Sequence, residues 1–313
     1  MHKMMNEPQK PAKPLNIIAY TDGTLKSVDA VRSAMRLAKA AKAELDILHV
    51  AQAPINPAQL PQPSVTVPRA EWGNLHDCLK HLTIDVISWL AAESFCQTPE
   101  GVTCKHEGPD LYRLTLDSVK PVRLWLSYDE PNEALQKLVN KYEADLVVIR
   151  GEETSILKRF IGKSVAETAA LKLPVSILVV RAPVYPDSPF VIASDGSESS
   201  RRAFGIVQKL LPAIRKPIDV LLKEGVDASI IEDWLKENDK KGETHNLDEV
   251  GAGLSPLRQL MFSMQPGQVL VVGASMRSYL LRFLHGSLPL SLVRRAPFSV
   301  LVSKEIPGLE EQQ

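Results

Sequence analysis

Short apolar runs alternate with longer amphipathic stretches along the chain. The run Leu15–Tyr20 precedes a stretch from Ser27 to Ala43 with apolar positions near a 3.6-residue period, and a second run, Leu45–Val50, follows directly. The short runs are typical of buried strands and the periodic stretch of a helix. Apolar strands that alternate with helices indicate parallel sheets covered on both faces. The pattern predicts a doubly wound α/β fold.

The same order of elements occurs twice. An apolar run at Phe190–Ala193, a helical stretch to about Leu211 and a run at Ile218–Leu222 repeat the opening of the chain. Each half then ends with an apolar run, a loop, a helix and a closing apolar run. We therefore predict a tandem duplication with domains at 14–182 and 188–304. Pro183–Pro189 carries three prolines and is the predicted linker.

The two halves differ in their middle segments. In the first half, Gln52–Arg69 is rich in Pro, Gln and Ala and predicts a long mobile loop, and a helix is expected from about Asn74 to Phe95. The insertion at 102–120 predicts an antiparallel ribbon. In the second half, helices are expected at 228–240 and 256–264, with a poor edge strand at 244–250.

Charge and apolar run length narrow the classes of partner. Lys plus Arg and Asp plus Glu both number 37, so the chain offers no basic field for nucleic acid or for an anionic membrane surface. No apolar run approaches the ~20 residues that span a bilayer, and residues 1–14 lack a signal-peptide core. We expect a soluble cytoplasmic protein with Cys78, Cys96 and Cys104 reduced.

A glycine-containing loop follows the predicted strand at 268–272. It reads Gly273-Ala-Ser-Met276, then nine residues, then Gly286-Ser287 at the start of a helix. Glycines let a backbone approach a ligand closely, and a helix N-terminus attracts anions, so this pattern is consistent with a phosphate cradle. A loop that needs glycine only for turning is equally consistent with it. Arg277 lies within the loop and could meet a phosphate or remain an exposed surface residue.

These motifs together resemble the universal stress protein family. They comprise Asp22-Gly-Thr24 and Asp195-Gly-Ser197 after the first strand of each half, the Gly-x2-Gly-x9-Gly-Ser type of loop, and the closing strand at 174–180. The resemblance covers nearly the whole chain as a tandem of two domains. It implies two doubly wound parallel-sheet domains of the adenine nucleotide alpha hydrolase-like fold. Because terminal strands of the family pair across a two-fold interface, we expect an internal pseudo-dimer, and further homodimerisation stays open.

The resemblance also implies a ligand, ATP or AMP, with Mg²⁺ able to accompany ATP. Adenine and ribose would lie near the Asp of the first strand and the end of the second strand, with phosphates over the glycine loop. The second half matches the family at Asp195, Gly273, Gly286 and Ser287, whereas Met276 stands where the family has its second glycine. A side chain at Met276 would crowd the phosphates.

The first half matches the same motif less well. Asp22, Gly151 and Ser164 agree with it, and Gly162 lies two residues before Ser164. Glu152-Glu153 follows Gly151 directly, and a carboxylate within ~4 Å of a phosphate costs about 1–4 kcal/mol. We expect a weaker or vacant first site and one functional site in the second half.

Other constellations carry less weight. Gly162-Lys163-Ser164 is not a Walker loop because Leu157 stands where that motif needs glycine. His285 is followed by Gly286-Ser287, but sequence neighbours seldom act as base and nucleophile. Four potential zinc ligands match no standard spacing, namely Cys78, His81, Cys104 and His106.

We therefore predict no catalytic residue and no metal site. The favoured function is binding of adenine nucleotide by a stress-response or regulatory protein with an unknown protein partner. The alternatives are an interaction module with two decayed sites, or a slow ATPase.

Overall fold

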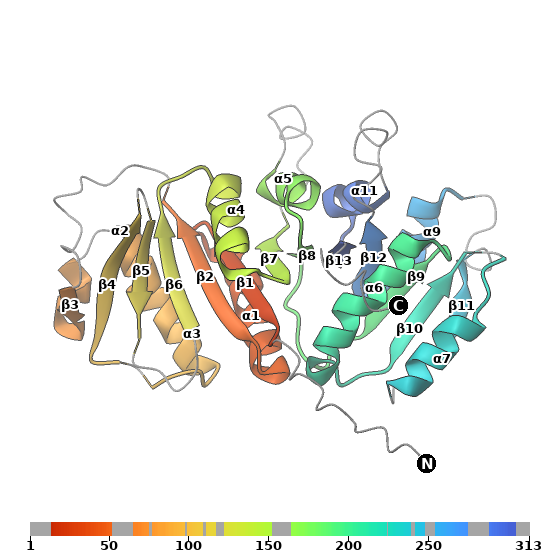
Figure 1. Cartoon of the computed structure of the whole chain (residues 1–313), viewed down its shortest axis with the longest axis horizontal. Helices are drawn as coiled ribbons and strands as arrows, with labels where there is room; N and C mark the ends of the chain where they lie inside the picture. The colour runs from red at the N-terminus through yellow and green to blue at the C-terminus, as the bar shows by residue number, and fades with distance from the viewer. Residues whose placement is uncertain are drawn as a thin grey trace, which may run out of the picture.

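The computed structural model describes residues 14–51, 65–74, 77–97, 99–108, 111–116, 122–151, 164–223, 225–238, 242–247, 254–274 and 288–304. Across these ranges, thirteen strands form one sheet in the order β11-β10-β9-β12-β13-β8-β7-β1-β2-β6-β5-β4-β3. The sheet runs the length of the molecule, from β3 at one end to β11 at the other (Figure 1). Among the described helices, none is long and apolar enough to cross a membrane.

The first half contributes a five-stranded parallel sheet and an antiparallel extension. Its parallel strands pair in the order β6-β2-β1-β7-β8. They are β1 (Asn16–Thr21), β2 (Glu44–Val50), β6 (Val122–Ser127), β7 (Leu146–Arg150) and β8 (Ser176–Val180). The antiparallel extension beyond β6 consists of β5 (Leu111–Thr115), β4 (Gly101–Gly108) and β3 (Val65–Pro68).

The second half repeats the parallel part without the extension. Its strands pair in the order β11-β10-β9-β12-β13. They are β9 (Phe190–Ser194), β10 (Ile218–Leu222), β11 (Thr244–Asn246), β12 (Val269–Ala274) and β13 (Ser299–Lys304). In both halves the first strand lies between the second and the fourth. The strand order therefore reverses between the first strand and the fourth. Such a switch point is where ligands bind in open α/β sheets.

The two halves join through their last strands. β8 and β13 pair antiparallel, with Val300 opposite Val179 and Val302 opposite Ile177. These side chains are at most 1 % exposed. The pairing of the last strands confirms the predicted internal pseudo-dimer, and the apolar layer on each face of the sheet contains residues of both halves.

Helices cover both faces of the sheet, as Figure 1 shows. One apolar layer lies under α1 (Val28–Ala41), α2 (Asp77–Lys80), α3 (Ile87–Ala92), α6 (Glu198–Leu210) and α7 (Ser229–Glu237). The other lies under α4 (Pro131–Tyr142), α5 (Val165–Lys172), α9 (Pro256–Ser263) and α11 (Leu288–Arg295). This two-sided covering confirms the predicted doubly wound fold.

Local sequence explains the bounds of α4. Glu130 caps its N-terminus, because the carboxylate accepts from the backbone N–H groups of Asn132 and Glu133. Pro131 occupies the first helical position, where no N–H is needed. The helix ends at Glu143, whose φ of 47° is left-handed.

The helix expected at about 74–95 is confirmed from Asp77 to Ala92, where α2, a π-helical segment (His81–Val86) and α3 follow one another directly. A 3-10 helix (Arg69–Asn74) precedes it. One prediction for the first half is corrected. The expected loop at 52–69 ends in a strand, β3, which pairs with β4, while 52–64 lies outside the described residues. The predicted ribbon is confirmed as β4 and β5, and the predicted edge strand as β11.

Candidate functional site

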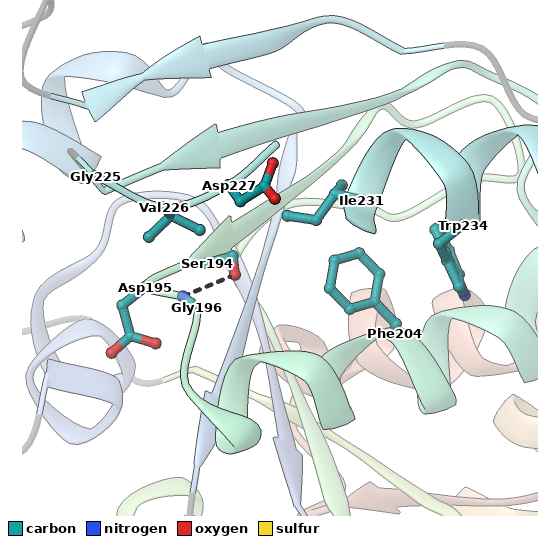
Figure 2. A pocket seen from close by; sticks show the side chains of 9 residues that line it. All are labelled: Ser194, Asp195, Gly196, Phe204, Gly225, Val226, Asp227, Ile231 and Trp234. Carbon is teal, nitrogen blue, oxygen red and sulfur yellow. Dashed lines mark hydrogen bonds between the residues drawn. The ribbon is translucent and has the colours of Figure 1, made fainter. Parts of the chain in front are cut away.

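A pocket opens in the second half beyond the carboxyl ends of β9 and β10 (Figure 2). We call it the β9–β10 pocket, and its volume is about 440 Å³. It is lined by Ser194, Asp195, Gly196, Phe204, Gly225, Val226, Asp227, Ile231 and Trp234. The pocket lies at the carboxyl edge of the sheet beside β9, whose other neighbour, β12, marks the switch point of this half.

One wall of the pocket is apolar and aromatic. Phe204 comes from α6, and Ile231 and Trp234 come from α7. The rings of Phe204 and Trp234 are 4.7 Å apart at their centroids and inclined by 57°. Aromatic walls of this kind favour flat ring systems.

The other end of the pocket is polar and acidic. Asp195 lies at the end away from Trp234 (Figure 2), and its Oδ1 accepts from the backbone N–H of Ser197 at 3.0 Å. Asp227 lies beside Ile231, nearer the aromatic wall than Asp195 (Figure 2). The Asp227 carboxylate accepts from the N–H of Ser229 at 2.9 Å, and this bond lowers the pKa of Asp227. Ionised carboxylates accept hydrogen bonds from hydroxyl and amino groups. The two carboxylates therefore suit a ligand edge that carries donors.

Gly196 is required by the geometry of the pocket. Its φ of 72° lies in the left-handed region, which glycine adopts without strain. A Cβ at this position would also lie 3.3 Å from both methyl groups of Val226. The N–H of Gly196 donates to Ser194 Oγ at 3.3 Å (Figure 2). A side chain at Gly196 would displace the loop after β10.

The structure places one predicted residue of the second half in the pocket, Asp195. Gly273 lies in β12 opposite Ser303, and its neighbour Val272 is opposite Ala193 of β9. Gly273 therefore lies one strand away from Asp195 and does not line the pocket. The other predicted residues lie outside the described residues, namely Met276, Arg277, Gly286 and Ser287.

Sequence reasoning missed the aromatic wall. Phe204 and Trp234 lie on the apolar faces of α6 and α7, where an aromatic side chain has the same spacing as any core residue. The signal that could have found Asp227 is its position directly before a helix and soon after the second strand, because polar groups at such strand ends line ligand sites.

The predicted residues of the first half have clear structural partners. Asp22 Oδ1 accepts from the N–H and the hydroxyl of Thr24 at 3.0 and 2.7 Å. Ser164 caps α5, since its hydroxyl accepts from the N–H of Glu167 at 3.1 Å. A Cβ on Gly151 would lie 2.5 Å from Arg181 Nε. Close packing against Arg181 therefore explains this glycine without a ligand. Gly162 lies outside the described residues.

Two histidines lie against Thr21 at the end of β1, His49 from β2 and His81 from the π-helical segment. Sequence analysis left both outside the site, treating His81 only as a potential zinc ligand. The ring centroids of His49 and His81 are 4.8 Å apart. His49 is 4 % exposed, and burial, followed by the charge of His81, lowers the pKa of His49 to about 4. Within the described part of the chain, no group of three or more His, Cys, Asp and Glu side chains could hold a metal ion.

Comparison with known families agrees with this architecture. Residues 15–181, more than half of the chain, match the universal stress protein family. The chain belongs to the universal stress protein family. No curated protein matches the chain significantly.

Solved structures share the fold over nearly the full length. A universal stress protein from Archaeoglobus fulgidus DSM 4304 is 13 % identical, with a TM-score of 0.60 over 92 % of this chain and 98 % of that one. A functionally unknown protein from Pseudomonas aeruginosa PAO1 is 12 % identical, with a TM-score of 0.52 over 93 % and 92 % of the two chains. A putative universal stress protein from Pseudomonas aeruginosa UCBPP-PA14 is also 12 % identical, with a TM-score of 0.51 over 92 % of each chain. At these identities the likeness establishes the fold.

Proposed function

We propose that this universal stress protein binds an adenine nucleotide, ATP or AMP, in its second half and acts in stress response or regulation through binding rather than as a dedicated enzyme. The observation that carries the proposal is the β9–β10 pocket. Its volume of about 440 Å³ falls within the range of small-molecule sites, about 300–1,000 Å³. Its aromatic wall and acidic end match the two parts of a nucleoside.

The distribution of charge orients the proposed ligand. Phosphates close to Asp195 and Asp227 would be repelled, whereas ribose hydroxyls would donate to the same carboxylates. The phosphates therefore point from Asp195 toward β12, where Gly273 begins the glycine loop of the sequence motif. Mg²⁺ would accompany ATP at that end.

The pocket supports binding better than catalysis. The titratable side chains that line the described pocket are those of Asp195 and Asp227. Each accepts a hydrogen bond from a backbone N–H group at the start of a turn or helix. We infer that nucleotide occupancy changes the conformation or the protein partner of the chain. Slow hydrolysis of ATP is a separate outcome of the experiments below.

A matched pair of variants tests the proposal. Asp195→Asn and Asp22→Asn change equivalent positions of the two halves. In each variant the Asn side-chain oxygen can still accept the hydrogen bond that the Asp accepts from a backbone N–H group. We expect Asp195→Asn to weaken AMP and ATP binding roughly tenfold or more, a loss of about 1.4 kcal/mol typical of a hydrogen bond to a charged group. Asp22→Asn should leave affinity within about twofold. Isothermal titration calorimetry on the full chain measures both.

The same titration distinguishes the alternatives. No binding of AMP or ATP by the wild-type chain would overturn the proposal and favour an interaction module. Equal loss in the two variants would contradict the assignment to the second half. Phosphate released from bound ATP over time would identify the slow ATPase.

A further inference from the structure

Residues at the ends of the last two strands are anchored on the opposite half of the chain. Arg181 follows β8 and Lys304 ends β13, each five residues after a serine of its own strand. The backbone N–H of Arg181 donates to Ser299 Oγ of β13 at 3.1 Å. In the same way, the N–H of Lys304 donates to Ser176 Oγ of β8 at 3.3 Å. Arg181 and Lys304 are therefore equivalent positions on the two sides of the junction.

Each of these cations reaches the C-terminal end of a helix in the opposite half. The Arg181 guanidinium donates to the carbonyl oxygens of Val293 and Arg294 at the end of α11, at 2.7 and 3.4 Å. The Lys304 ammonium donates to carbonyl oxygens at the end of α5. The last carbonyls of a helix lack intrahelical partners, and a cation at this end complements the helix dipole. We call these two contacts the exchanged caps.

A glycine of the first half makes room for the cap on α11. A Cβ on Gly151 would lie 2.5 Å from Nε of Arg181 and 2.9 Å from both its Cδ and its Cζ. The N–H of Gly151 donates to the carbonyl oxygen of Val180 at 2.9 Å, which fixes the backbone beside Arg181. A side chain at Gly151 would therefore push the guanidinium away from α11.

A second contact between the halves holds the same end of α11. Helices α5 and α11 lie side by side over the junction (Figure 1). Arg294 Nε of α11 lies 2.9 Å from Oε2 of Glu167, which belongs to the first turn of α5. The Glu167 side chain is only 15 % exposed. The C-terminus of α11 is thus held by two elements of the first half, the end of β8 and the start of α5.

The other end of α11 lies at the edge of the sheet where the β9–β10 pocket opens. β12 and β13 are parallel neighbours, and α11 connects them, so α11 runs from the carboxyl edge of the sheet to its amino edge. β12 also pairs with β9, whose end lines the pocket. α11 has eight residues and is about 12 Å long. A helix this short moves as one body, so holding its last turn also sets the position of its first.

We propose that Arg181 is a positioning residue for the ligand site of the other half: the cap that the first half places on α11 sets where the positive end of this helix stands toward the ligand's phosphate. A helix N-terminus attracts phosphate through its dipole and its N–H groups. The first half then supports the site of the second without taking up a ligand itself. The effect on the ligand rests on the proposed function, whereas the exchanged caps do not.

Calorimetric titration of the full chain with AMP and with adenosine tests the role of Arg181. Adenosine offers the β9–β10 pocket the same nucleoside without a phosphate, so the ratio of the two affinities reports on the phosphate. We expect Arg181→Met to weaken AMP binding about two- to fivefold, as is typical of one charge at a helix terminus, and to leave adenosine binding unchanged. Arg181→Lys should restore AMP affinity, because a lysine makes the equivalent cap at Lys304. Lys304→Met removes only the cap on α5 and should keep the wild-type ratio.

Gly151→Ala tests the same cap without removing a charge. Its methyl group displaces the Arg181 side chain, so this variant should lower the ratio of AMP to adenosine affinity as Arg181→Met does. Gly73→Ala is the matched control, because a Cβ on Gly73 meets no atom within 4 Å. Equal weakening of AMP and adenosine, or a wild-type ratio in both Arg181→Met and Gly151→Ala, would overturn the positioning role. A ratio lowered as much by Lys304→Met would overturn it too.

Hydrogen exchange of backbone amides at neutral pH tests the exchanged caps without a ligand. Arg181→Met should speed exchange in the last turn of α11 and leave α5 unchanged, and Lys304→Met should do the reverse, because an uncapped helix end opens more often. Exchange that rises in neither helix, or in both helices alike, would overturn the caps. Failure of the wild type to bind either ligand would contradict the proposed function instead, and the exchange pattern would then decide the caps by itself.

Discussion

Ile177 of β8 and Val302 of β13 lie opposite each other in the antiparallel pair that joins two parallel sheets. Both belong to one apolar layer shared by the halves. The core of each half is therefore completed by the other, as in a dimer interface built into one chain.

Truncation at this junction should destabilise the whole chain. Ile177 is fully buried, so we expect Ile177→Ala to lower the free energy of unfolding by about 2–5 kcal/mol through lost burial and a cavity. Ile84→Ala is the control, because Ile84 is 41 % exposed, and it should change stability by less than about 1 kcal/mol. Urea unfolding followed by circular dichroism measures both. Equal effects of the two variants would show that the junction contributes no core.

Much of the fold follows from periodicity in the sequence. Each predicted parallel strand is an apolar run. Because the same order of strands and helices occurs twice, each half supported the prediction for the other. The π-helical turns inside the helix at 77–92 did not follow, because Leu79, Leu82, Val86 and Leu90 keep a helical period whether the turns are α or π. β3 was missed because its pairing with β4 supplies the backbone hydrogen bonds that its short sequence does not signal.

The site was less predictable than the fold. Asp195 was found because an Asp-Gly turn after a first strand is a local pattern. The contacts of His49 with His81 and of Phe204 with Trp234 arise between segments that are distant in sequence. The residue types at these positions and the number of residues between them therefore do not predict the contacts. Gly151 was assigned to phosphate from its motif, whereas the structure supplies a packing reason, the side chain of Arg181.

Lys304 should make stability rise with pH in the alkaline range. Its ammonium donates to the carbonyl oxygens of Ala169 and Leu173 at the end of α5, and burial lowers the pKa of Lys304 from 10.5 to about 8. Between these values the unfolded chain binds more protons than the folded chain, so raising the pH favours the folded state. The gain is on the order of 3 kcal/mol across the window.

Lys304→Met should remove this alkaline gain, which is measured as the difference in urea midpoint between variant and wild type at a series of pH values. Lys236→Met is the matched control, since the Lys236 side chain is 71 % exposed. If the urea midpoint of Lys304→Met runs parallel to that of the wild type between about pH 8 and pH 10.5, the lowered pKa of Lys304 is contradicted.

His49 should make the chain sensitive to acid. Its pKa is lowered from 6.5 to about 4, so its neutral form is favoured by folding. The contribution of neutral His49 to the free energy of unfolding is fully present above about pH 6.5. It is lost as the pH falls toward 4, because the unfolded chain takes up the proton at a higher pH than the folded chain. We expect His49→Asn, which retains a side-chain N–H near the Thr21 carbonyl, to lose less stability than the wild type over that range. Thermal unfolding at matched pH values measures the difference. His106→Asn, which changes an exposed histidine, should follow the wild type, and a His49→Asn curve that coincides with both would rule out His49 as the source.

The aromatic wall of the β9–β10 pocket should contribute to ligand affinity by shape as well as by burial. Phe204→Leu keeps an apolar side chain against α7 but removes the flat ring that faces Trp234. Because aromatic pairs add about 0.5–1.5 kcal/mol beyond burial, we expect AMP to bind roughly two- to twelvefold more weakly. Phe262→Leu makes the same change at a residue that is 71 % exposed and distant from the pocket lining, and its affinity should equal that of the wild type. Calorimetric titration of both variants, with folding checked by circular dichroism, measures the effect. Unchanged affinity in a folded Phe204→Leu protein would place the ring of the ligand outside this pocket.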